Sequence, residues 1–194
     1  MKYRTVLLFG APGSGKGTQG KILGTIPGLF HFACGDAFRN LRITDPLGKL
    51  FIQFSSQGQL VPDEPTIDLW RRNIEASTVN QTFDPVHDML VLDGIPRNAR
   101  QAEILKDTLD VKAVFHLTCP DMTKMVERLQ RRALRENRLD DANLDIIRQR
   151  LETYDRETKP VLDFYGPALV HQIDSGQTPL NVLRQILSIV ARLV

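Results

Sequence analysis

Cysteine, long apolar runs and a strong net charge are all scarce in this sequence, and each absence excludes a class of protein. Only two of the 194 residues are cysteines, Cys34 and Cys119. Two cysteines cannot build a disulfide framework or a thiolate metal site on their own, and they suit a reducing compartment. No apolar run approaches the roughly 20 residues that cross a membrane, and Val6–Phe9 is far shorter than the core of a secretory signal. We therefore expect a cytoplasmic protein with no membrane partner.

The composition is that of an ordinary globular protein. The formal net charge is +2, which is too close to neutral for a general nucleic-acid binder. Hydrophobic residues make up 42% and charged residues 25%, and the sequence contains no repeat and no low-complexity tract, which excludes a disordered protein. The length falls within the roughly 100–200 residues of one domain. We expect a single domain and, since no surface signal argues otherwise, a monomer.

Apolar runs and helical patterns alternate along the chain. Five short apolar runs predict strands at Thr5–Phe9, Leu29–Ala33, Met89–Leu92, Val111–Leu117 and Ala168–Ile173. Helical spacing relates the apolar residues Met122, Met125, Val126 and Leu129, and again Leu180, Leu183, Ile186, Leu187 and Val190. This alternation predicts an α/β fold in which helices cover both faces of a mainly parallel sheet.

Two segments interrupt the alternation. The first reads as consecutive helices at Asp36–Arg42, Pro46–Gln57 and Pro65–Ser77, with Gly58 placed to end the second. The second, residues 131–141, is short and highly charged. We therefore expect a core at about 1–33, 80–130 and 142–194, a small helical subdomain at about 34–63, and a short lid at about 131–141.

The segment Gly10–Thr18 follows the first strand and has the composition of a phosphate-binding loop. Its glycines let successive backbone N–H groups point at an anion, and the helix that starts near Lys16 adds its positive end. The strict pattern G-x-x-x-x-G-K-[ST] fails by one residue, because Gly17 follows the lysine and Thr18 comes next. A plain glycine-rich turn is the alternative. The strand before the loop and the helix after it favour a nucleotide site.

An acidic residue, Asp93, closes the apolar run Met89–Leu92. A carboxylate at the end of a buried strand beside a phosphate loop is where hydrated Mg²⁺ is held. An acid that merely caps the strand is the alternative. With the phosphate loop present, we favour magnesium bound through water.

Several segments together resemble one family. Gly10–Gln19 (GAPGSGKGTQ) resembles the phosphate loop of adenylate kinases and related nucleoside monophosphate kinases, and Leu92–Arg97 resembles their D-G-[FY]-P-R segment, with Ile95 at the aromatic position. Further matching segments are Gly35-Asp36-x-x-Arg39, Gly58–Asp63, Arg128-x-x-x-Arg132, Arg138–Asp141 and Arg150-Leu151. They cover the chain in order. The resemblance implies a P-loop kinase fold, a three-layer sandwich with a central parallel sheet and a small helical subdomain for the nucleoside monophosphate. It also implies Mg²⁺-dependent, reversible transfer of the ATP γ-phosphoryl group to AMP, giving two ADP.

The resemblance also implies roles for individual residues. The ATP-binding residues would be Gly13, Ser14, Gly15, Lys16, Gly17, Thr18, Arg128, Arg132 and Gln177. The AMP-binding residues would be Cys34, Arg39, Gln59, Leu60, Val61, Gly94, Arg97, Gln101, Arg138 and Arg150. The catalytic residues would be Lys16, Arg97, Arg132, Arg138 and Arg150, with Asp93 for Mg²⁺.

Arginine is the residue type that this chemistry requires. The acceptor phosphate is already ionised, so transfer needs stabilisation of spread negative charge more than it needs a base. An isolated arginine cluster would more often be a solvated face, and we keep that interpretation for Arg131 and Arg135. A nucleic-acid patch would carry interleaved aromatics, which this segment lacks. For Asp140 and Asp141 two interpretations stay open: acids at a helix N-terminus, or acids that hold arginines or magnesium water.

The sequence leaves some questions of specificity open. The Gln101 amide can donate and accept at once, as adenine requires, but Asn98 stands where pyrimidine monophosphate kinases usually carry asparagine. A UMP/CMP kinase is therefore one alternative, and a P-loop regulatory module is another. Cys34 replaces the usual Thr or Ser, and we expect it to loosen base discrimination. Only five residues, Ala133–Asn137, separate Arg132 from Arg138, so we expect no structural zinc in the lid.

Overall fold

The core of the molecule is a five-stranded parallel sheet. The structure is a computed structural model that describes residues 2–136, 138–141 and 143–193. The strand order is β2-β3-β1-β4-β5, and every neighbouring pair is parallel. The strands are β1 (Tyr3–Phe9), β2 (Leu29–Ala33), β3 (Met89–Asp93), β4 (Leu109–Thr118) and β5 (Val170–Asp174). The five predicted strands are confirmed, with ends that differ by no more than two residues.

Helices connect the strands. They are α1 (Lys16–Leu23), α2 (Cys34–Arg39), α3 (Pro46–Ser55), α4 (Asp63–Val79), α5 (Ala99–Leu105), α6 (Met122–Glu136), α7 (Leu144–Thr153), α8 (Val161–Tyr165) and α9 (Pro179–Val190). A 3₁₀ turn at Leu139–Asp141 precedes α7, and a π-helical turn at Tyr154–Thr158 follows it. The predicted helices of the first interruption correspond to α2, α3 and α4, although α2 begins earlier, directly after β2. None of the described helices is long and apolar enough to cross a membrane.

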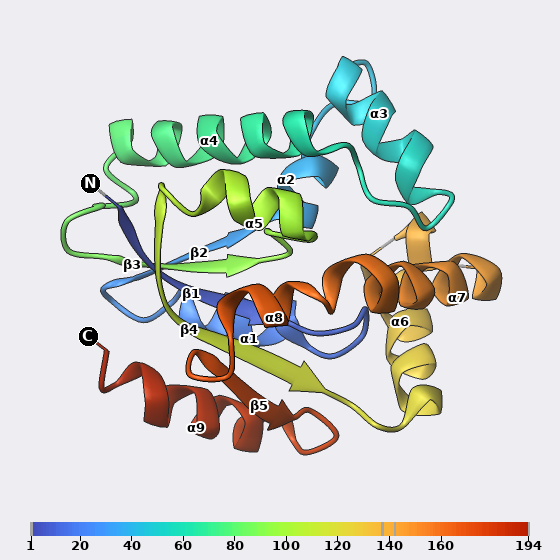
Figure 1. Cartoon of the computed structure of the whole chain (residues 1–194). Coiled ribbons are helices and arrows are strands. Elements are labelled where there is room, and N and C mark those ends of the chain that lie inside the picture. The colour runs from blue at the N-terminus through green and yellow to red at the C-terminus, as the bar shows by residue number, and fades with distance from the viewer. Residues whose placement is uncertain (1, 137, 142, 194) are drawn as a thin grey trace.

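Alternating side chains of β1 enter two separate cores. Leu7 and Phe9 belong to an apolar cluster with Trp70 of α4, whereas Val6 and Leu8 belong to a second cluster with Ile186 of α9. Figure 1 shows α4 and α9 on opposite sides of the sheet. Both faces of the sheet are therefore buried, which explains why the strands are continuous apolar runs rather than alternating ones. The predicted α/β sandwich is confirmed.

Two residues predicted to be in apolar helix stripes are exposed. Met122 is 52% exposed and Leu180 is 73% exposed. Both lie in the first turn of their helices, whereas the buried residues of the same stripes, such as Leu129 and Ile186, lie further along. The prediction was wrong there because helical spacing identifies the direction of a face but not where along the helix the contact begins.

Each interruption places a helix beyond the carboxyl ends of the strands: α3 in the first and α6 in the second (Figure 1). In the first, the rings of Phe38 in α2 and Phe51 in α3 stack with centroids 5.3 Å apart, and Asp45 caps α3 by accepting from the Leu47 N–H at 2.8 Å. In the second, α6 continues as helix as far as Glu136. Residues 137 and 142, at the predicted lid and its boundary with the core, lie outside the described residues. So do residues 1 and 194, at the predicted ends of the core.

Candidate active site

A large cavity of about 610 Å³ opens at the carboxyl ends of the strands, where ligands bind in open α/β sheets. Its walls are the phosphate loop, α2, the loop 58–61, the segment 93–97, the end of α6 and the loop 175–179. The predicted donor and acceptor segments therefore share one cavity.

The phosphate loop is shaped by its own backbone. Positive φ angles occur at Gly10, Gly13 and Gly15, and the Ser14 N–H donates to the Ala11 carbonyl at 3.1 Å. Gly15, with φ +95°, is the N-cap of α1 and carries no side chain to occupy the end of the helix. The helix N-terminus therefore faces the cavity with its positive end available to an anion.

The Lys16 ammonium folds back over this loop. It donates to the Gly10 carbonyl at 2.6 Å and to the Ala11 carbonyl at 3.1 Å. Burial is the main cause that lowers the pKa of Lys16, to about 8; the charge of Asp93 opposes this shift, and the nearby arginines add to it. A cation whose pKa is depressed in this way would be stabilised by a bound phosphate.

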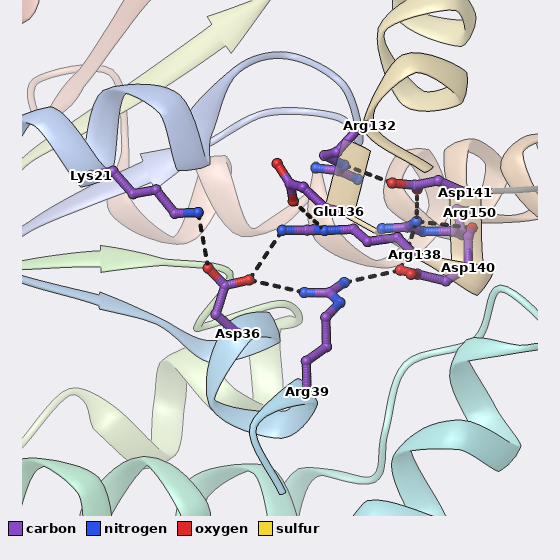
Figure 2. A network of polar contacts seen from close by, with 9 residues as sticks. All are labelled: Lys21, Asp36, Arg39, Arg132, Glu136, Arg138, Asp140, Asp141 and Arg150. Atoms are coloured by element: carbon purple, nitrogen blue, oxygen red, sulfur yellow. Dashed lines mark hydrogen bonds and ion pairs between the residues drawn. The ribbon is translucent and has the colours of Figure 1, made fainter. Parts of the chain in front are cut away.

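A network of carboxylates holds the arginines of the cavity, and Asp36 of α2 is its first centre (Figure 2). Asp36 Oδ1 accepts from Arg39 Nη1 at 3.2 Å and from Arg138 Nη2 at 3.1 Å. Its Oδ2 lies 3.8 Å from the Lys21 ammonium. Arg138 Nε also forms an ion pair with Glu136 Oε2, at 2.6 Å. Asp36 thus joins α2 to the segment that follows α6.

Asp140 and Asp141 are the second centre of this network. Asp140 Oδ2 pairs with Arg39 Nη2 at 3.0 Å and with Arg150 Nη1 at 2.9 Å. Asp141 accepts from Arg132 Nε at 2.6 Å and also from Arg150 Nη1. The two acids are 8% and 0% exposed. Burial raises the pKa of Asp140, but Arg150 and Arg39 outweigh it and lower that pKa overall. Of the two open interpretations, the structure supports acids that hold arginines.

A second set of polar contacts surrounds Gln101, which is 1% exposed. Its Oε1 accepts from the Arg97 N–H at 2.8 Å, and its Nε2 donates to Asp63 Oδ1 at 2.9 Å. Asn98 caps α5 by accepting from the Gln101 N–H and also donates to Asp63, at 2.7 Å. The Arg97 Nε donates to the Gly94 carbonyl at 2.8 Å. The presence of asparagine at position 98 is therefore explained by its two structural contacts, the cap of α5 and the bond to Asp63.

Cys34 begins α2 at the wall of the cavity. It is 2% exposed and belongs to the same apolar cluster as Phe38 and Val61. Burial raises the pKa of the thiol to about 11, so Cys34 is neutral at physiological pH. It is therefore not a reactive thiolate.

The loop 175–179 closes the predicted donor side. Arg128 Nη2 donates to the Ser175 carbonyl at 3.0 Å, and Gln19 Nε2 donates to the Pro179 carbonyl at 3.0 Å. The Gln177 side chain accepts from Gln185 Nε2 at 3.3 Å. These bonds fasten the loop to α6, α1 and α9. Arg131 and Arg135 are exposed at the rim of the cavity, as a solvated face predicts.

Asp93 faces the phosphate loop. A Cβ atom added to Gly17 would lie 3.6 Å from Asp93 Oδ2, so the carboxylate points at the first turn of α1. That position fits a Mg²⁺ ion bound to Asp93 through water and to nucleotide phosphates. Among residues 2–136, 138–141 and 143–193, no group of three or more His, Cys, Asp or Glu side chains could hold a metal ion by itself.

Two acids of the site, Asp36 and Asp63, lie inside the family's motifs but had no predicted role. The charge of Asp36 among the arginines was a signal that could have identified its role. No signal identified the contacts of Asp63, because its partners Asn98 and Gln101 are 35 and 38 residues away along the chain.

Comparison with known proteins agrees with this geometry. The sequence model of the family described as "Adenylate kinase" matches residues 8–169. An adenylate kinase of Cyanothece sp. is 37% identical over 195 residues, which cover 97% of this chain and 95% of the relative. One of Bacteroides thetaiotaomicron is 37% identical and covers 88% of this chain and 89% of its own length. One of Prochlorococcus marinus is 36% identical, with 85% and 84% covered. The chain belongs to the adenylate kinase family.

Proposed function

We propose that this protein transfers the γ-phosphoryl group of ATP to AMP, reversibly, giving two ADP. The observation that carries the proposal is that the phosphate loop and the acceptor segments line the same cavity, with the arginines of both among its walls. A nucleotide-hydrolysing regulatory module needs no second group of phosphate-binding residues. A phosphotransferase with two nucleotide substrates does.

The donor half of the cavity would hold ATP. The backbone of Gly13–Thr18, the start of α1 and the Lys16 ammonium would hold its phosphates. Arg128 and the loop with Gln177 would lie against its adenine. Asp93 would hold Mg²⁺ through water, and the ion would neutralise charge on the donor phosphates.

The acceptor half would hold AMP. Arg39 and Arg97 would bind its phosphate, and Gln59–Val61, Gly94, Cys34 and Gln101 would surround its ribose and base. The Gln101 amide still has one N–H and one lone pair beyond its two bonds to the protein, which suits adenine.

Arg132, Arg138 and Arg150 would stabilise the transferring group. Guanidinium groups match phosphate oxygens bidentately and stay charged throughout. In the structure the carboxylates of Asp36, Asp140 and Asp141 hold them. Nucleotide phosphates would take over part of these contacts, so the arginines are ordered before the substrate arrives and need little rearrangement.

The test is ADP formation with ATP, Mg²⁺ and one nucleoside monophosphate at a time. We expect AMP to be preferred over CMP and UMP, chelation of Mg²⁺ to stop the reaction, and RNA or DNA to have no effect. A preference for CMP or UMP would identify the pyrimidine kinase, and ATP hydrolysis independent of any monophosphate would identify the regulatory module. We also propose a cytoplasmic monomer. Light scattering during gel filtration tests the monomer.

A further inference from the structure

One hydrogen bond joins the loop after α3 to helix α7. The Thr153 hydroxyl, at the C-terminal end of α7, donates to the Gly58 carbonyl at 3.1 Å across 95 residues of sequence. Thr153 is 3% exposed, and Gly58 is buried too. A buried carbonyl without a donor is costly, so this bond fixes where the loop lies on the helix.

The loop and the helix approach each other closely at the same point. Gly58 has φ +68°, and a Cβ atom there would lie 2.9 Å from Gln149 Cβ and 3.1 Å from the Arg150 backbone nitrogen. Only glycine meets both requirements without strain. The backbone of the loop therefore rests on the part of α7 that carries Arg150.

Helix α7 is itself anchored to the sheet. After Thr153 it widens into the π-helical turn Tyr154–Thr158, a geometry that occurs often at functional sites. The Tyr154 hydroxyl lies 3.0 Å from Nε2 of His116 on β4. His116 is paired in register with Phe9, the last residue of β1 before the phosphate loop. The C-terminal end of α7 is thus fixed beside the phosphate loop, and the loop 58–61 packs against it.

We propose that Thr153 is a positioning residue for the acceptor nucleotide. Its hydroxyl fixes the Gly58 carbonyl, and through it the loop 58–61, relative to the Arg150 guanidinium. Thr153 acts through this loop and takes no part in phosphoryl transfer. The inference rests on the proposed function, since that function assigns the loop 58–61 and Arg150 to AMP.

The consequence is specific to one substrate. The loop 58–61 lines the predicted acceptor side, whereas ATP is held by the phosphate loop and the loop 175–179. Without the Thr153 hydroxyl, the Gly58 carbonyl loses its donor, and the position of the loop 58–61 on α7 is no longer fixed. Losing one neutral hydrogen bond corresponds to roughly a three- to tenfold change in an equilibrium. We therefore expect the KM for AMP to rise by that factor while the KM for ATP stays the same.

The experiment compares Thr153→Val, which keeps the shape and removes the hydroxyl, with Thr153→Ser, which keeps the hydroxyl. Thr153→Ala serves as a second deletion of the hydroxyl if valine does not fold. The matched control is Thr5→Val: Thr5 is 0% exposed, and its hydroxyl donates at 2.8 Å to the Tyr3 carbonyl within β1, away from the cavity. For each protein, kcat, both KM values and the thermal unfolding midpoint are measured.

We expect Thr153→Val to raise the KM for AMP three- to tenfold, Thr153→Ser to restore it to within twofold, and Thr5→Val to lower the unfolding midpoint without changing either KM. An unchanged KM for AMP, an equal rise for both nucleotides, or the same rise in Thr5→Val would overturn the inference while leaving the proposed function intact. A wild-type protein without AMP-dependent ADP formation would instead overturn the proposed function, and this inference with it.

Discussion

The phosphate loop and the arginine cluster border the same cavity but are built in opposite ways. The loop owes its shape to neighbours in sequence: Ser14 bonds to Ala11, and Lys16 folds onto Gly10. In the cluster, side chains far apart in sequence hold one another: Arg39 bonds to Asp140 across 101 residues. The loop is thus an anion site made of backbone, whereas the arginines are held by carboxylates that phosphates would displace. A substitution in the loop should therefore lower the catalytic rate, whereas a substitution in the cluster should also lower the free energy of unfolding.

The largest expected effect is that of Lys16→Met. Removing one pre-organised charge from a phosphoryl-transfer site costs roughly a hundred- to a thousandfold in kcat. Stability should change little, because burial already disfavours the charged lysine in the folded protein. Steady-state kinetics and thermal unfolding check both statements. Lys124→Met, at a 58% exposed side chain of α6, is the control and should leave both unchanged. Near-native activity in Lys16→Met would refute the assignment of the loop.

Asp141→Ala tests the cluster. Asp141 is 0% exposed and pairs with both Arg132 and Arg150, so its removal takes a buried carboxylate from two partly buried guanidinium groups, of which Arg150 keeps its pair with Asp140. Breaking a buried pair in this way costs about 3 kcal/mol of the free energy of unfolding. ADP should recover part of the loss, because its phosphates can take the place of the missing carboxylate.

Urea unfolding with and without ADP measures both effects. The matched control is Asp145→Ala, which breaks the exposed pair with Arg148 and should change stability little. If Asp141→Ala is as stable as the wild type, the cluster is not held together as described. If ADP stabilises the variant no more than it stabilises the wild type, the exchange of carboxylate for phosphate is wrong.

The same contrast between local and long-range contacts explains which features could be predicted from the sequence. The phosphate loop, the five strands and Asp93 depend on contiguous patterns, and the structure has the predicted strands and places the loop and Asp93 side by side. Met122 and Leu180 were placed wrongly because periodicity does not say where a helix meets its neighbour. The contacts of Asp36, Asp63 and Thr153 were not predicted at all, since each depends on how distant segments come together. The arginines were identified from the family's motifs. Of the carboxylates that hold them, Asp140 and Asp141 were considered for this role, whereas Asp36 was not.

A pH profile distinguishes the loop from the cluster without any substitution. Lys16 is charged below its pKa of about 8 in the nucleotide-free protein and loses its charge above it, whereas guanidinium groups stay protonated. We therefore expect kcat/KM for ATP, which reports the free enzyme, to fall about tenfold per pH unit above pH 8. In the complex the phosphates favour the charged lysine, so kcat should stay level to higher pH. A profile for kcat/KM that is flat to pH 10 would contradict this role of Lys16.

The smallest expected effect concerns Cys34, on the acceptor side of the cavity. A thiol is a weaker hydrogen-bond partner than the hydroxyl that related kinases usually carry there, and Cys34 packs in an apolar cluster. Gln101, by contrast, is held in place by Arg97 and Asp63 with one N–H and one lone pair to spare. Most of the discrimination between bases should therefore come from Gln101, with a smaller contribution available at position 34.

We expect Cys34→Thr to increase the preference for AMP over CMP and UMP, measured as the ratio of kcat/KM values, by roughly three- to tenfold, the equivalent of one neutral hydrogen bond. Gln101→Ala should reduce the same ratio by more, because a site built around a buried amide discriminates strongly between bases that pair with it and bases that do not. The unfolding midpoint of each variant shows whether a change in the ratio reflects the site or the fold. If Cys34→Thr leaves the ratio unchanged, Cys34 is only a small apolar residue of the wall. If Gln101→Ala also leaves it unchanged, backbone groups of the loop 58–61 read the base.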